Sequence, residues 1–155
     1  MRWKGFTIVL AVILSAWVFS QSGMANAEGQ HMSKQQFAET MTTIRTGKDS
    51  AIRTDAAQHL FELTRGKGSK QLDDKSIAEI ASLLDGSKDS VRYWVARCLG
   101  NFGPRAKMAV PRLTSLLQEV DCLKGDKTSA SGIRFALTQI GVTPPPEPIC
   151  NTVKQ

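Results

Sequence analysis

The sequence predicts an all-α fold, namely a short α-solenoid of about three helical hairpins. Apolar residues recur at the spacing of one helix face along most of the chain, and glycine or proline interrupts these runs. The same two-helix pattern returns with a period near 40 residues. No stretch of the sequence alternates as a strand would. Hairpins of this length cannot bury their apolar faces alone, so they are expected to stack.

The central hairpin has the clearest helical pattern. One helix is predicted from about 90 to 102, with Asp89 and Ser90 at its start and Gly103-Pro104 at its end. A second helix, from about 107 to 120, tolerates Pro111 only in its first turn. Each has one apolar face: Val91, Val95, Cys98, Leu99 and Phe102 in the first, and Val110, Leu113, Leu116 and Leu117 in the second.

Three more helices are predicted before this hairpin. Ser33 and the triplet Lys48-Asp49-Ser50 are expected to begin the first two, and either Asp73 or Asp74 caps the third. Their apolar faces carry Phe37, Met41 and Ile44 in the first, Ile52, Ala56, Leu60 and Leu63 in the second, and Ile77, Ile80, Ala81, Leu83 and Leu84 in the third.

An internal repeat links these helices. The segment KDSAIR at 48–53 recurs as KDSVR at 88–92, and the residues that follow match at a separation of 39. A third copy falls in a last predicted helix, 129–140, which Gly141 ends. The matched positions are Ala56 with Val95, Ala57 with Ala96, Leu60 with Leu99 and Leu63 with Phe102, then Val95 with Ile133, Leu99 with Leu137 and Phe102 with Ile140.

The first 27 residues are typical of a secretory signal peptide. Arg2 and Lys4 precede an apolar run of about 14 residues, and Ala25-Asn26-Ala27 is a small-x-small cleavage site. The run is shorter than the roughly 20 residues that a membrane span needs. We therefore expect signal cleavage after Ala27, no stable membrane anchor afterwards, and a periplasmic or secreted protein with a solenoid at 28–142 and a Pro-rich tail at 143–155.

Charge and ligand patterns exclude several classes of function. The chain has 20 basic and 14 acidic residues, and without Arg2 and Lys4 its net charge is about +4. The basic residues are scattered rather than clustered with aromatics, so no nucleic-acid binding is expected. His31 and His59 are isolated and no CxxC occurs, so the sequence predicts neither a metal site nor a cofactor.

The three cysteines remain after signal cleavage. Cys98 lies on an apolar helix face, where a free thiol behaves as a small hydrophobic residue. Cys122 and Cys150 lie in a polar insertion and in the tail, and in an oxidising compartment we prefer a disulfide between them. Connectivity does not follow from sequence, so either Cys98 or Cys150 remains open as the partner of Cys122.

The central hairpin also resembles a known repeat. The segment DSVRYWVARCLGNFGPRAKMAVPRLTSLL at 89–117 resembles the HEAT repeat, particularly the short HEAT-like type also found in phycobilisome lyases. The resemblance is specific over about 30 residues; the first hairpin lacks the Gly-Pro turn, as a terminal capping repeat would. HEAT proteins typically act as scaffolds that bind other proteins, so the resemblance implies a protein-binding role.

The resemblance also implies roles for individual residues. An arginine at the position of Arg53 and Arg92 usually pairs with an acid of the neighbouring repeat, here Asp49, Asp85 or Asp89, in a structural ladder. Second helices of HEAT units usually line the concave surface. Tyr93, Trp94, Arg97 and Asn101 would then form a partner-binding patch, extended by Asp55, Gln58, His59 and Glu62. The alternative is that Trp94 packs against the neighbouring helix.

The expected function is therefore that of an exported, non-catalytic protein-binding module whose partner is a protein. The alternative is a small inhibitor or immunity protein that blocks a secreted enzyme such as a cell-wall hydrolase. An enzyme is not expected, because no activated nucleophile or phosphate-binding glycine loop is present in the sequence. A third hypothesis, catalysis by Cys98, would require a thiol that reacts quickly in the folded protein.

Overall fold

A computed structural model describes residues 32–122 and 125–147. The expected signal peptide, Cys150 and the end of the Pro-rich tail lie outside the described residues. The elements are α1 (Lys34–Thr46), α2 (Ser50–Leu63), η1 (Gly66–Lys70), α3 (Asp74–Ser82), α4 (Asp89–Asn101), η2 (Gly103–Ala109), α5 (Val110–Val120) and α6 (Ser129–Ile140), where η marks a 3-10 helix.

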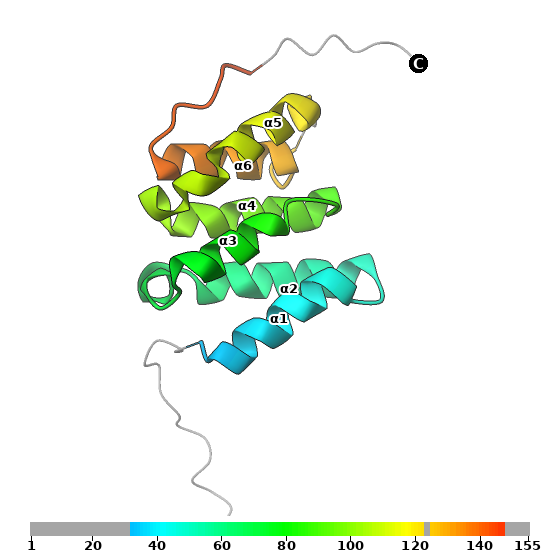
Figure 1. Ribbon diagram of the computed structural model, residues 1–155. Helices are drawn as coiled ribbons and strands as arrows, with labels where there is room; N and C mark the ends of the chain where they lie inside the picture. Colours follow the sequence, from blue (N-terminus) through cyan, green and yellow to red (C-terminus); the bar gives the residue numbers. More distant parts are fainter. Residues whose placement is uncertain (1–31, 123–124, 148–155) are drawn as a thin grey trace, which may run out of the picture.

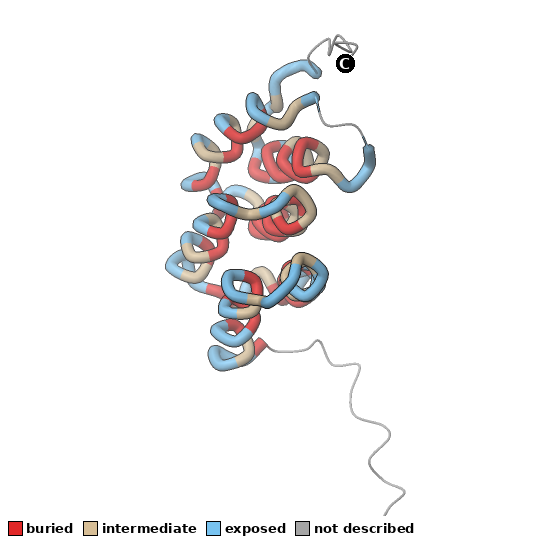
Figure 2. The backbone as a smooth tube through the Cα atoms, turned by 90° about the vertical axis from the view of Figure 1, so that its right-hand side faces the viewer, coloured by how far each residue is buried: buried red, intermediate tan, exposed pale blue. Residues whose placement is uncertain are grey.

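The helices form a stack of three successive hairpins in two layers. Helices α2, α4 and α6 lie side by side in one layer, and α1, α3 and α5 lie in the other (Figure 1). In the perpendicular view the layers stand next to each other, with exposed turns on the outside (Figure 2). The predicted all-α fold is confirmed.

One apolar core runs through the whole stack. Its fully buried large side chains come from all six α-helices and from the turn after α3: Met41, Leu60, Ile77, Ile80, Leu84, Leu99, Leu113, Leu116, Leu117, Ile133, Leu137 and Ile140. Most of these positions follow the predicted helix faces, because a stripe at i, i+3 and i+4 points one side of each helix inward.

Side-chain caps fix where several helices begin. Ser33, Asp49, Asp73 and Thr128 each accept a hydrogen bond from the backbone N–H three residues on. The backbone and side-chain hydrogen bonds from Ser76 lower the pKa of Asp73 below its usual value. The first three caps confirm the sequence expectations, and Asp73 rather than Asp74 caps α3.

Three local expectations need correction. Ile52 is 44% exposed, because α2 turns Ala57 and Phe61 inward beside Leu60 instead. The helix predicted from 107 begins only at Val110, since the preceding turn is the 3-10 helix η2. Asp89 does not cap its own helix: its carboxylate accepts hydrogen bonds from the backbone N–H and hydroxyl of Ser129, at the start of α6.

Among the helices of residues 32–122 and 125–147, none has the length and hydropathy of a membrane-spanning segment.

Candidate functional site

Aromatic rings and one arginine gather along the layer formed by α2, α4 and α6. We call Phe61, Tyr93, Trp94, Arg97 and Phe135 the aromatic–arginine cluster. The ring of Trp94 lies 4.8 Å from that of Tyr93 in an edge-on arrangement and 5.3 Å from that of Phe61. These separations are typical of favourable ring pairs. The cluster therefore joins residues from all three helices of this layer.

Arg97 lies at the centre of the cluster. Its guanidinium carbon is 4.1 Å from the ring centroid of Phe135 on α6, 5.3 Å from that of Phe61 on α2 and 5.8 Å from that of Tyr93. One Nη donates to the Tyr93 hydroxyl at 3.4 Å, whereas the buried Nε has no hydrogen-bond partner among the described residues. The flat cation is thus held mainly by ring faces.

The four residues expected to bind a partner differ in how they are placed. Tyr93 is only 6% exposed, and Trp94, Arg97 and Asn101 are half-buried. The Asn101 amide donates at 3.1 Å both to the Phe61 carbonyl and to Thr64, so it satisfies the end of α2. Of the four predicted partner-binding residues, Trp94 and Arg97 are therefore the two that reach the surface and could contact a partner.

The residues expected to extend this surface lie on α2. Asp55, Gln58, His59 and Glu62 are all exposed. Glu62 pairs with Arg65 at 3.1 Å, one turn further on. Sequence reasoning missed Phe61 and Phe135, whose contribution depends on which helices become neighbours.

The expected arginine–acid ladder has different partners in the structure. Arg92 donates from Nε to the Leu84 carbonyl at 3.2 Å, and the buried Nε of Arg53 has no acceptor in the described part of the chain. Asp85 pairs with Arg112 at 2.5 Å. Asp89 holds Ser129, as described above. Neighbouring hairpins are therefore linked by Asp89–Ser129 and by Arg112–Asp85, not by Arg53 or Arg92 with an acid.

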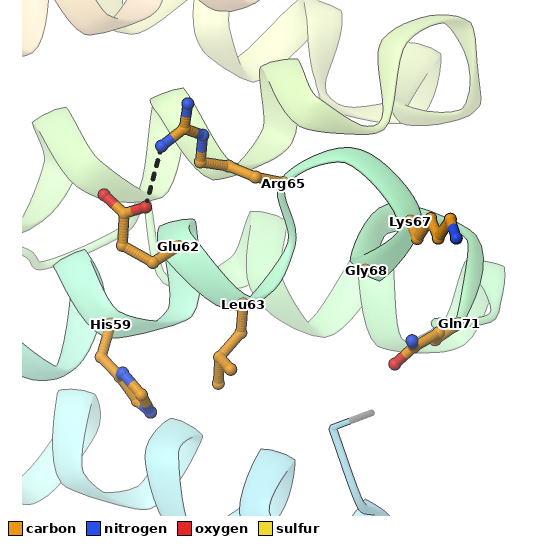
Figure 3. A pocket seen from close by; sticks show the side chains of 7 residues that line it. All are labelled: His59, Glu62, Leu63, Arg65, Lys67, Gly68 and Gln71. Atoms are coloured by element: carbon orange, nitrogen blue, oxygen red, sulfur yellow. Dashed lines mark hydrogen bonds and ion pairs between the residues drawn. The ribbon is translucent and has the colours of Figure 1, made fainter. Parts of the chain in front are cut away.

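A shallow hollow of about 430 Å³ lies beside the end of α2 and η1 (Figure 3). His59 and Leu63 point to the same side of α2, away from the Glu62–Arg65 pair (Figure 3). Lys67, Gly68 and Gln71 complete the lining. The lining includes an exposed histidine, but a general base would also need a nucleophile or substrate group within hydrogen-bond reach. The residues that line this hollow include no serine, threonine or cysteine, so they form no arrangement of a base with a nucleophile.

The Cys98 thiol is fully buried and not part of a disulfide. Its sulfur lies 3.3 Å from the Thr64 hydroxyl. Burial raises the pKa of this thiol from 9.0 to about 12, and the Thr64 hydrogen bond opposes part of that rise. Since the thiolate is the nucleophile, Cys98 is poorly placed for catalysis. Cys122 is exposed, and its expected partner Cys150 lies outside the described residues.

Two consequences for Cys98 can be measured. Iodoacetamide at pH 8 should label Cys98 at least a hundredfold more slowly in the folded than in the urea-unfolded chain, because little thiolate forms.

The pKa of the Cys98 thiol is higher in the folded than in the unfolded chain, so the buried thiol stabilises the fold below pH 9. That contribution is lost as the pH rises toward 12. Cys98→Ala should lack this part of the alkaline loss in thermal unfolding. Rapid labelling of folded Cys98, identified by peptide mass, would contradict the assignment.

Metal ligands do not gather in the part of the chain that the structure describes: no group of three or more His, Cys, Asp or Glu side chains lies close together there. Comparison with protein-family models, with curated proteins and with solved structures finds no match to this chain.

Proposed function

We propose that this chain is an exported, non-catalytic protein-binding module of HEAT-like hairpins, which binds a protein partner with the α2–α4–α6 layer around Trp94 and Arg97. One observation carries the proposal. Trp94 and Arg97 are half-buried, and their orientations are fixed by rings from neighbouring hairpins. Tryptophan and arginine are the residue types that most often dominate binding energy at interfaces.

Fixed side chains favour binding for an entropic reason. A free arginine or tryptophan loses rotamer freedom when a partner orders it, which costs about 0.5–1.5 kcal/mol for each side chain. In this chain the cluster has ordered both before any partner arrives. Arg97 is half-buried, with one Nη donating to Tyr93, so a carboxylate or carbonyl of the partner suits the part of the guanidinium that reaches the surface.

The proposal includes a disulfide between Cys122 and Cys150. Arg134 on α6 donates to Asp121 at 2.6 Å and to the Pro145 carbonyl at 2.5 Å. The tail is thereby held beside the loop that carries Cys122, and Cys150 follows a few residues later in the sequence. Peptide mapping without reduction should recover a peptide pair linked through these two cysteines, whereas Cys150 found as a free thiol would contradict the pairing.

The partner-binding proposal is tested by a double variant. Trp94→Ala with Arg97→Ala should lower the recovery of a cross-linked partner at least tenfold, because hot-spot residues commonly contribute 2 kcal/mol or more each. Lys75→Ala, on α3 in the opposite layer, is the control and should leave recovery unchanged. Circular dichroism of each variant separates lost binding from lost folding.

The outcomes are distinct. A stoichiometric partner that is lost only in the double variant supports a binding module. If that partner is a secreted hydrolase whose activity falls on binding, the module is an inhibitor. Equal recovery with the folded double variant would show that Trp94 and Arg97 serve packing alone and would overturn the assigned surface.

A further inference from the structure

A second, smaller cavity lies where the first two hairpins meet at their turns. Its volume is about 150 Å³, and it is lined by the end of α1, the first turn of α2, the α3–α4 connection and Val91 of α4. This edge is the one that carries the α1–α2 and α3–α4 connections (Figure 1). Three of its lining side chains are cations: Arg45, Arg53 and Lys88.

Arg53 is the unusual member of this lining. Its Nε is buried, and neither it nor the rest of the guanidinium has a hydrogen-bond acceptor among the described residues. The repeat-equivalent Arg92 shows what the position normally does, because its Nε donates to the Leu84 carbonyl at 3.2 Å. Arg97 has a buried Nε as well, but three rings surround its cation. Arg53 has neither a carbonyl nor a ring in the described chain.

The charges around the cavity are unbalanced. The contact of Arg45 is a 3.5 Å hydrogen bond to the Ser82 hydroxyl, and Lys88 has no ion pair within the described ranges. The lining contains one acid, Asp85, and its carboxylate is engaged by Arg112 at 2.5 Å. The three cations therefore face the cavity without an anion of their own. Arg45 and Lys88 are exposed, whereas the Nε–H of the half-buried Arg53 is a buried donor without a partner among the described residues. Buried polar donors are normally hydrogen-bonded, so this donor beside two further cations favours an anionic ligand.

We propose that this cavity binds a compact dianionic oxyanion, a phosphate group that is free or carried as a monoester. The cavity is smaller than the 300–1,000 Å³ of pockets that enclose a whole cofactor or drug-sized ligand, so it fits one small group. A guanidinium offers two parallel donors to a phosphate, and Arg45 and Lys88 add charge at the exposed side. In this proposal Arg53 donates to the bound phosphate, whereas the repeat-equivalent Arg92 donates to a backbone carbonyl of the chain itself.

The test is a titration of the full-length chain with inorganic phosphate, followed by ¹H–¹⁵N spectra of the arginine Nε–H groups. Phosphate should shift the Arg53 signal in a saturable way. Arg53→Gln should weaken binding about tenfold or more, as expected for the loss of charge-assisted hydrogen bonds. Arg65→Gln, the same substitution at the larger hollow, is the matched control and should bind phosphate like the unchanged chain.

Two further arms keep the result decisive. Lys88→Ala changes an exposed residue, so weakened binding in this variant supports the site even if Arg53→Gln does not fold. Comparison with phenyl phosphate shows whether the cavity prefers a phosphate monoester or the free ion, and a preference for either supports a phosphate site. Acetate that binds as well as phosphate, shifts that grow linearly over all basic residues, or unchanged affinity in a folded Arg53→Gln chain would overturn the proposal.

Discussion

Asp121→Ala should lower the free energy of unfolding by about 3 kcal/mol, the cost expected when one partner of a buried ion pair is removed. Asp121 and Arg134 are only 11% and 16% exposed, and the guanidinium donates to both carboxylate oxygens at 2.6 Å and from Nε at 2.9 Å. Without the carboxylate, Arg134 keeps the proline carbonyls of the tail but loses its counter-charge. Urea unfolding followed at 222 nm measures the change.

Two related variants sharpen this expectation. Asp126→Ala removes an exposed acid from the same connection and should change stability by less than about 0.5 kcal/mol. Adding Arg134→Met to Asp121→Ala should restore part of the loss, since the uncompensated buried charge is then gone. If Asp121→Ala unfolds at the same urea concentration as Asp126→Ala, the pair is not a structural link between α5 and α6.

Gly132→Val should destabilise the chain by about 3 kcal/mol, at the upper end of what overpacking of a close contact costs. A Cβ at this position would lie 2.7 Å from the carbonyl oxygen of Tyr93 and 3.1 Å from its Cα. These are backbone atoms of α4, so no side-chain rotation relieves the clash. Helices α4 and α6 would have to move apart, and the melting temperature should fall accordingly.

Thr138→Val is the control for this substitution, because it places the same side chain at an exposed position of the same helix. It should change the melting temperature little. Gly100→Ala tests a contact with a side chain instead of with backbone, since its Cβ would meet the Phe135 ring at 2.7 Å. That ring can rotate, but doing so removes it from Arg97. Equal stability of Gly132→Val and Thr138→Val would contradict the close approach of the two helices.

Local chemistry made the helices predictable from sequence. Ser33, Asp49 and Asp73 cap their helices as expected, because a cap acts on backbone groups three residues away. Gly141 ends α6 with a φ of 94°, a left-handed conformation that glycine adopts without strain. The order of six helices and the all-α fold follow from such interactions between residues that are close in the sequence.

Contacts between hairpins were not predictable in the same way. Asp89 was expected at its own helix start, yet it binds Ser129, which is 40 residues away. A carboxylate beside a helix start can cap that helix or a neighbour, and only the stacking decides which. The sequence pattern places Ile52 on the buried face of α2, whereas the stack buries Ala57 and Phe61 and leaves Ile52 exposed.

The candidate site shows the same limit. The resemblance to HEAT second helices implies a patch that includes Trp94 and Arg97, and in the structure both are half-buried and reach the surface. Their surroundings come from other hairpins, because Phe61 belongs to α2 and Phe135 to α6. Tyr93 and Asn101 carried equal weight in the sequence pattern, but one is buried and the other is used by the end of α2. The resemblance suggests which helix carries the site, and the packing of the neighbouring helices determines which of its residues stay accessible.

The interfaces of α4 with its two neighbouring helices differ in extent, and this difference affects which part of the stack opens first. Helix α4 packs more extensively against α6, where Gly132 permits close approach, than against α2. In a linear array, each unit is stabilised by its neighbours, and the unit with the weaker joint opens first. Amide hydrogens of α1 and α2 should therefore exchange with solvent deuterium sooner than those of α4 and α6. The first hairpin would then unfold locally while the other two hairpins remain folded.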